Sequence, residues 1–185
     1  MWRYAFMKLI SFVLLCLVSS FPSTEVDKEK MPWSDSRTLT WSDFQGIPNA
    51  GDDYVASTNS GVSFSYSISF KNGVKDFNFT VESHFYPKLS WYRKGQVNDY
   101  ILGHEQTHFD ISELHARILK KRLSEATFSD AIKAEIKVIY EKTEQERRDM
   151  QNRFDVETVH SNIRKNEIQW ELFVAEQLRS YERWK

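Results

Sequence analysis

The sequence predicts an α+β fold, in which a small antiparallel sheet in the N-terminal half packs against a mostly helical C-terminal half. All six glycines and all four prolines precede residue 104, so turn-forming residues are confined to the first part of the chain. Serine alternates with apolar residues from Val62 to Phe70, which is the two-residue period of a strand. After residue 98 apolar residues recur at helical spacing, so helices follow the sheet.

The composition suits a folded chain of one domain. Its 185 residues are 41% apolar and 15% aromatic, which is enough to bury a core. The formal charge is −1 and no block of basic residues is present, so we expect no nucleic-acid partner. Residues 21–36 are polar and contain proline, and we interpret them as a loose N-terminal arm ahead of a single domain over residues 37–185.

The first 20 residues have the pattern of a signal peptide. Arg3 and Lys8 give a positive start, residues 9–18 are nearly all apolar, and Ser19 and Ser20 are small enough for cleavage. The apolar run is about half of the roughly 20 residues that span a bilayer, so we expect no stable membrane span. Export to the periplasm or the extracellular space follows.

The single cysteine, Cys16, lies inside this leader. A lipoprotein would have a small residue just before that cysteine, whereas Leu15 precedes it, so lipid anchoring is the less favoured alternative. The cleaved chain would have no thiol, which excludes disulfides and cysteine ligands for a metal.

Residues 62–85 predict a β-hairpin with one aromatic face. Lys71-Asn72-Gly73 supplies the turn, because an Asn-Gly pair tolerates positive φ. The return strand continues the alternation at Phe77, Phe79, Val81 and Phe85. We expect this face to cover the helices, and one edge of the hairpin could also pair with an extended peptide. A short strand is also expected at Leu39 and Trp41.

Three amphipathic helices are expected after the hairpin. The first would be capped by Asn98 or Asp99, the second by Ser129 or Asp130, and the third would cover residues 162–184. Their expected apolar stripes are Ile101, Leu102, Leu114, Ile118 and Leu119; Ile132, Ile136, Ile139 and Tyr140; and Ile168, Leu172, Phe173, Ala175 and Leu178. Charged pairs such as Glu113 with Arg117 are expected to be solvated or to support a site from outside it.

The first helix carries a metal-binding pattern, His104-Glu105-Gln106-Thr107-His108. Four residues advance about 400° around a helix and about 6 Å along it, so both imidazoles leave one face and can meet on one ion. Zinc accepts such nitrogen ligands and leaves one position to water in a catalytic site. Glu105 is offset by about 100° from His104, which suits a general base acting on that water.

A third ligand must come from elsewhere in the chain. We predict His160, because the 52 residues after His108 allow the chain to go out and back as a helical hairpin. It ends a segment, residues 153–160, that we interpret as a break between helices. Asp155 and then Glu157 are the alternative ligands, and those carboxylates that do not bind the metal could orient the imidazoles.

The remaining candidates near the motif are expected to lie outside the metal site. His115 is about 10 Å along the helix from His108, too far to share an ion, and is expected to be structural. His84 falls in the polar phase of its strand and is expected to be exposed. Asp110 is about 200° around the helix from His108 and should point away from the ion, in a polar stripe with its helical neighbours.

Four motifs resemble the bacterial domain of unknown function 922 family, described as predicted secreted zinc-dependent proteases. They are TWSDFQGIP (40–48), LSW (89–91), LGHEQTHFDISELHAR (102–117) and FDVETVH (154–160). The resemblance covers about residues 37–175 and implies a zincin-like site. A glycine often follows the histidine that corresponds to His160 in this family, whereas Ser161 follows it here.

These observations lead to an exported zinc-dependent peptidase as the expected function. His104, His108 and His160 would bind Zn²⁺, and Glu105 would act as general base on a zinc-activated water that attacks a peptide or protein substrate. Tyr86, Tyr92 and Tyr100 are unassigned candidates for stabilising the oxyanion. The alternative is a non-catalytic envelope protein in which zinc is structural and the helices dock a partner; the oligomeric state is not predicted.

Overall fold

The computed structural model describes residues 30–185 except residues 52 and 73, and confirms the α+β fold. The predicted signal peptide, with Cys16, lies outside the described residues. Three helices, α1 (Asp99–Glu125), α2 (Ile132–Thr158) and α3 (Arg164–Ser180), form the C-terminal half. Among the described residues, no helix combines the length and apolar character needed to cross a bilayer.

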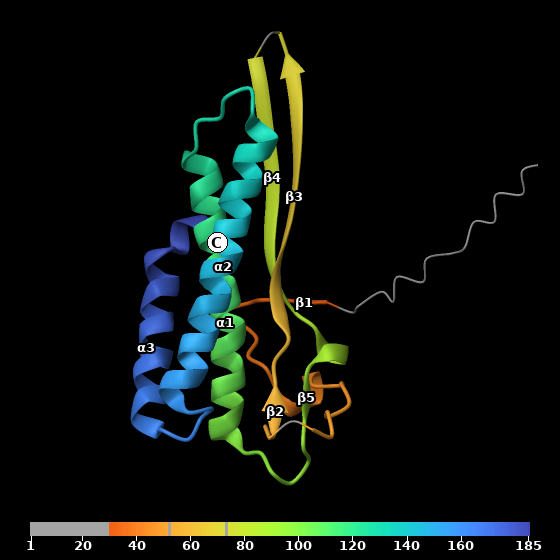
Figure 1. The fold of residues 1–185 in the computed structure, drawn as a ribbon, viewed down its shortest axis with the longest axis vertical. Helices are drawn as coiled ribbons and strands as arrows, with labels where there is room; N and C mark the ends of the chain where they lie inside the picture. The colour runs from red at the N-terminus through yellow and green to blue at the C-terminus, as the bar shows by residue number, and fades with distance from the viewer. Residues whose placement is uncertain (1–29, 52, 73) are drawn as a thin grey trace, which may run out of the picture.

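The hairpin predicted from residues 62–85 is present and longer than expected. Strands β3 (Ser60–Lys71) and β4 (Val74–Phe85) pair antiparallel, with Phe64 opposite Val81. Asn72, in the turn, has the positive φ of 53° that its sequence predicts. The aromatic face covers the helices as expected, since Phe64 stacks on Tyr140 with centroids 5.8 Å apart. In Figure 1 the hairpin runs along α1 and α2 on the side opposite α3.

A second, two-stranded sheet lies beside the start of α1. It pairs β2 (Ala56–Ser57) with β5 (Trp91–Tyr92) antiparallel. Figure 1 shows it at the end of the molecule away from the hairpin tip. Short 3-10 helices complete the fold at η1 (Trp41–Asp43), η2 (Pro87–Leu89) and η3 (Glu182–Trp184).

The strand expected at Leu39 and Trp41 is wrong, because η1 occupies this region. The Asp43 carboxylate accepts hydrogen bonds from both the backbone N–H (2.8 Å) and the hydroxyl (2.9 Å) of Thr40, which closes the turn. This local side-chain bonding competes with an extended chain. Leu39 is nevertheless buried, and its N–H donates to Gln106 Oε1 on α1 at 2.7 Å.

The described part of the expected loose arm is held by the fold. Strand β1 (Met31–Pro32) pairs with β4, giving the sheet order β1-β4-β3. The indole N–H of Trp33 donates to Asp110 Oδ1 on α1 at 2.7 Å. Residues 31–33 therefore belong to the folded part of the chain.

The helix ends agree with the sequence at α1 and differ at α2. Asn98 caps α1 as expected, since its Oδ1 accepts the Ile101 N–H at 3.0 Å. Helix α2 begins after Ala131 with no capping side chain, because the Ser129 hydroxyl bonds Glu135 instead. It continues to Thr158, so the expected break over residues 153–160 is wrong in extent, and the helices separate only at residues 159–163.

The buried face of α3 differs from the predicted stripe at Ile168, Leu172 and Phe173, whereas Leu178 is buried as predicted. Ile168 is 44% exposed, Leu172 65% and Phe173 38%. The face turned toward α1 and α2 consists of Glu167, Trp170, Val174 and Leu178. The spacing of this second set is equally helical, and it includes a glutamate that apolar periodicity could not assign to the interior.

A buried polar network lies on the side of α1 that carries Asp110. Arg117 is 1% exposed, and its Nε donates to Glu113 Oε1 at 2.8 Å. Its Nη1 donates to the carbonyl of Leu178 on α3 at 2.7 Å, and Ser83 on β4 donates to Glu113 Oε2 at 2.6 Å. The Glu113–Arg117 pair is therefore internal, and it joins α1 to the hairpin and to α3.

We predict that Arg117→Met lowers the free energy of unfolding by about 3–5 kcal/mol, because it leaves the Glu113 carboxylate buried without its cation. Urea denaturation measures the change. The control is Lys137→Met, which breaks an exposed pair with Glu141 and should leave the urea midpoint near wild type. Equal losses in the two variants would contradict a special role for the buried pair.

Candidate metal centre

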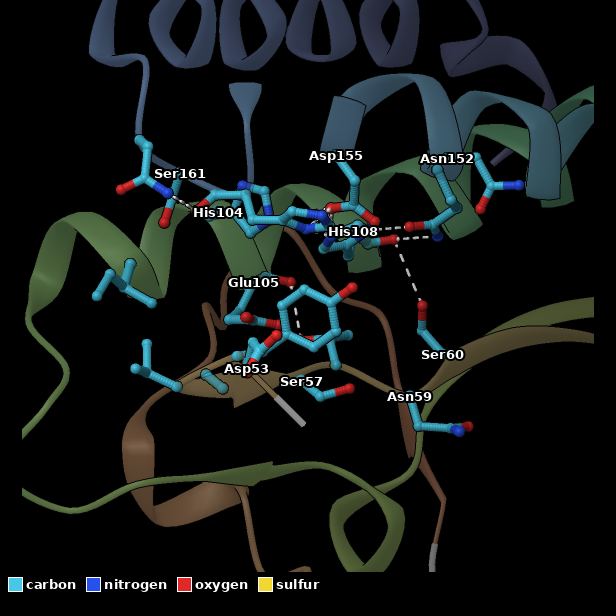
Figure 2. A pocket seen from close by; sticks show the side chains of 18 of the residues that line it. Asp53, Ser57, Asn59, Ser60, His104, Glu105, His108, Asn152, Asp155 and Ser161 are labelled. Carbon is cyan, nitrogen blue, oxygen red and sulfur yellow. Dashed lines mark hydrogen bonds and ion pairs between the residues drawn. The ribbon is translucent and has the colours of Figure 1, made fainter. Parts of the chain in front are cut away.

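Two histidines of α1 and an aspartate of α2 meet at one point. His108 Nε2 lies 3.2 Å from His104 Nε2 and 2.9 Å from Asp155 Oδ1, and His104 Nε2 lies 3.2 Å from the same oxygen. Among the histidine, cysteine, aspartate and glutamate side chains of the described residues, these three are the ones close enough together to hold a metal ion. Figure 2 shows the three side chains gathered on one side of a pocket.

The outer nitrogen of each imidazole is bound by a neighbouring helix. His104 Nδ1 lies 3.1 Å from both carboxylate oxygens of Glu167 on α3, a side chain with no exposed surface. His108 Nδ1 contacts Gln151 Oε1 on α2, and the same amide donates from Nε2 to the His108 carbonyl at 2.9 Å. Both Nδ1 atoms therefore donate, so both Nε2 atoms are directed at the shared point, where each offers a lone pair to a metal once its imidazole is neutral.

The helical register of α2 explains how Asp155 reaches the histidines. Gln151 and Asp155 are four residues apart and so lie on one face of the helix. Phe154, which is fully buried, stacks on the His104 ring with centroids 4.4 Å apart and meets the His108 ring edge-on at 5.1 Å. An apolar support thus fixes the ring planes while the next residue supplies the carboxylate.

The charge around this point is strongly negative. Burial, the largest effect on His104, lowers its pKa, but hydrogen bonds to Asp155 and Glu167 and the nearby Glu105 charge outweigh it and raise the pKa to about 9. Burial acts to raise the pKa of Asp155, but its hydrogen bonds to His104 and His108 hold that pKa far below its ordinary range. Three carboxylates around two imidazoles favour a cation.

The donor set fits a divalent metal. Two imidazole nitrogens and one carboxylate oxygen are ligands that zinc accepts, with a further position left open for water or substrate. The described residues contain no cysteine, so a thiolate site is excluded there. His104, His108 and Asp155 could therefore hold a metal ion.

Glu105 lies beside this group and is buried, with an exposed fraction of 3%. Its Oε2 has no hydrogen-bond partner among the described residues, although it is buried. In Figure 2 Glu105 lies between the histidines and Asp53. A buried carboxylate oxygen without a partner costs free energy, so a proton donor such as water is expected to bind it.

The group opens into a polar cleft of about 680 Å³. One wall is the segment 53–60, and the other consists of α1, α2 and the turn at residues 160–162. Hydrogen bonds hold the segment against α1, from the Thr58 hydroxyl to the Glu105 carbonyl (3.2 Å) and between the hydroxyls of Ser60 and Ser112 (2.8 Å). The cleft therefore has fixed walls on both sides of the metal-binding group.

The candidates for the third ligand are placed differently by the fold. Asp155, the alternative, completes the group of three. His160 does not join it, although its Nδ1 lies 3.7 Å from Asp155 Oδ1 and it lines the same cleft. Glu157 points elsewhere and accepts a hydrogen bond from the Trp170 indole at 2.8 Å. Whether His160 binds a metal remains a prediction.

The other candidates lie outside the group. His115 is buried and bonds the Ile111 carbonyl at 2.8 Å, as a structural histidine would. The expected exposure of His84 is wrong, because His84 is only 7% exposed. Strand β1 covers it, with Pro32 paired opposite His84, and His84 Nε2 forms a hydrogen bond with the Ser63 hydroxyl at 2.7 Å.

The three tyrosines proposed for an oxyanion role, Tyr86, Tyr92 and Tyr100, do not line the cleft. Asp110 points away from the site, as expected.

Sequence reasoning missed three residues of the site. Gln151 could have been found from its spacing of four from Asp155 on a continuous helix. Glu167 stands in phase with the buried Trp170 and Val174, and a charged residue on an internal face signals a polar partner. Tyr54, which lines the cleft opposite the helices, carries no motif that would have identified it.

The fold and the site define an α+β protein with a candidate metal centre on a His-Glu-x-x-His helix. The chain belongs to the family described as "Bacterial protein of unknown function (DUF922)", whose model matches residues 42–161. That range contains the three possible ligands and Glu105, and it ends before Glu167. No curated protein and no solved structure matches the chain.

We predict that Asp155→Asn weakens zinc binding by more than about 100-fold, because it removes the charge of a carboxylate that would bind the ion. Loss of a group that only supports a ligand typically costs about 10–100-fold in metal affinity. Glu157→Gln is the matched control, because it removes a carboxylate two residues away that bonds Trp170 instead. Competition with a chromophoric chelator gives both affinities. Similar affinities for the two variants would argue against Asp155 as a ligand.

We predict that Glu167→Gln weakens zinc binding by about 10-fold, because the neutral amide still accepts from His104 Nδ1 but no longer supports it with a charge. Glu176→Gln, on the exposed side of α3, serves as the control and should bind zinc like wild type. The same competition titration applies. An unchanged affinity in Glu167→Gln would show that this carboxylate does not tune the site.

Proposed function

We propose that the protein is an exported, zincin-like, zinc-dependent peptidase that hydrolyses peptide bonds in the cleft beside His104, with Glu105 as general base. The observation that carries this proposal is the buried, unpartnered Oε2 of Glu105 next to the three possible ligands. A purely structural metal site has no need of such a carboxylate, whereas a hydrolytic site needs a base at this position. The polar cleft gives a substrate access to it.

The ligand set in this proposal is His104, His108 and Asp155. Zinc, when bound there, polarises the scissile carbonyl and acidifies a water. Glu167 and Gln151 hold the two imidazoles in the tautomer that presents Nε2. Both helices that supply these supports pack on α1, so the ligand geometry is set before substrate arrives.

Glu105 carries the proton in this scheme. Its carboxylate accepts a proton from the attacking water as the water oxygen bonds to the carbonyl carbon. When the C–N bond breaks, the same carboxyl gives that proton to the leaving amine, so Glu105 ends in its starting state. Burial of Glu105 in a polar but partly enclosed cleft strengthens these electrostatic interactions.

Strand β2 supplies a way to hold an extended peptide. It lines the cleft, and among the described strands β5 is the one that pairs with it, so a peptide strand could be added on its other side. A peptide added along this edge would lie across the start of α1, where Glu105 lies. Export, through the predicted signal peptide of residues 1–20, completes the proposal and would place the substrates outside the cytoplasm.

One observation favours the alternative of a non-catalytic envelope protein that docks a partner. The outward face of α3 exposes Ile168, Leu172 and Phe173, and large exposed apolar residues gather at interaction sites. A docking role for this face would require neither the cleft nor Glu105. Loss of partner capture on mutation of Leu172, with no peptide turnover by wild type, would support this alternative.

We predict that Glu105→Gln retains zinc and loses at least about 100-fold in the rate of hydrolysis of labelled casein, because the amide cannot accept the water proton. Glu125→Gln, at the exposed end of the same helix, should cleave at the wild-type rate. Zinc content is measured beside turnover for each protein. Equal turnover in Glu105→Gln and wild type would contradict the general-base role.

A further inference from the structure

The turn that joins α2 to α3 has an unusual backbone. Val159, His160 and Ser161 follow one another with φ of 51°, 49° and 63°. Left-handed conformations cost about 1–2 kcal/mol for residues other than glycine, and a β-branched valine is a rare occupant. Such strain persists where the surroundings impose it, and it is concentrated at functional sites.

Hydrogen bonds from both sides impose this turn. The His160 N–H donates to the Asp155 carbonyl at 2.9 Å, and the Ile163 N–H donates to the Thr158 carbonyl at 2.8 Å. The Asn162 side chain donates to the Val159 carbonyl at 2.7 Å. The result is that His160 is held beside the last turn of α2, the turn that carries Asp155.

The side chain of His160 is near the metal-binding group and outside it. Its Nδ1 is 3.7 Å from Asp155 Oδ1, which is longer than a hydrogen bond, and it is not one of the three close ligands. It lines the cleft with 45% of its side chain exposed, and among the described residues neither ring nitrogen forms a hydrogen bond. An imidazole N–H is thus available to a molecule in the cleft.

Tyr54, on the opposite wall, holds the imidazole in place. The two rings have centroids 4.6 Å apart. The Tyr54 carbonyl accepts a hydrogen bond from Arg93 Nε at 3.0 Å, which fixes the segment that carries the tyrosine. His160 is therefore positioned by its own turn on one side and by a ring contact on the other.

We propose that His160 donates a hydrogen bond to the oxygen of a carbonyl bound over His104, His108 and Asp155, with Tyr54 positioning its ring. This inference rests on the proposed peptidase function and assigns the oxyanion stabiliser that it lacks. As water adds to a scissile carbonyl, the π electrons move onto this oxygen, and a donor already in place stabilises the charge. Loss of one such donor typically costs about 10²–10³ in kcat.

The test uses zinc-loaded protein and two probes, acetohydroxamate for binding and labelled casein for turnover. His160→Ala is expected to bind zinc within about 3-fold of wild type, to bind acetohydroxamate about 10-fold more weakly, and to lose about 100-fold in kcat with a smaller change in KM. His160→Asn, whose amide can donate, should recover part of both losses. Val159→Ala, an exposed neighbour in the same turn, is the control and should match wild type.

Each outcome decides for or against the donor. A fall in zinc affinity of more than about 100-fold in His160→Ala would make the residue a ligand and overturn the proposal. Unchanged acetohydroxamate binding would also overturn it, as would a Val159→Ala variant that loses as much as His160→Ala. If wild type does not cleave casein, the peptidase function fails while the hydroxamate measurement still decides the role of His160.

Discussion

His104 Nε2, His108 Nε2 and Asp155 Oδ1 converge on one point, and the rest of the site depends on this convergence. Acceptors this close repel one another unless a proton or a metal ion lies between them. Glu167 and Gln151 maintain the arrangement by occupying the outer nitrogens of the rings, so neither ring can turn to relieve it. The fold thus stabilises a geometry that is favourable mainly around a cation.

Helix α1 connects this site to the rest of the molecule. The side that carries His104 and His108 meets α2 and α3, while Asp110 and Arg117 bind the N-terminal segment and the end of α3. All three helices contribute to the centre: α1 supplies the two histidines, α2 supplies Asp155 and α3 supplies Glu167. Metal binding and the packing of these helices should therefore stabilise each other.

The sequence predicted the features that local patterns determine. The alternation from Val62 to Phe70 predicted the hairpin, Asn98 predicted the start of α1, and the spacing of His104 and His108 predicted their convergence. The four-residue helical spacing places the two imidazoles together whatever packs around them.

Features that depend on packing between distant segments were not predictable in this way. Glu167 interrupts an apolar pattern, so periodicity favoured Ile168 and Leu172, which the fold leaves exposed. His84 was expected to be solvated because its strand alternates, but β1 covers it. Whether Asp155 or His160 is the better candidate for the third ligand depends on where α2 ends. The sequence gives no strong signal for this helix end, because no glycine marks it.

The most direct test of this account is anomalous diffraction at the zinc absorption edge from crystals of the protein grown with zinc. The account predicts one peak per chain at about 2.0–2.2 Å from His104 Nε2, His108 Nε2 and Asp155 Oδ1, with His160 outside bonding distance. A chain without a peak at this point, or a peak bonded to His160 in place of Asp155, would contradict it.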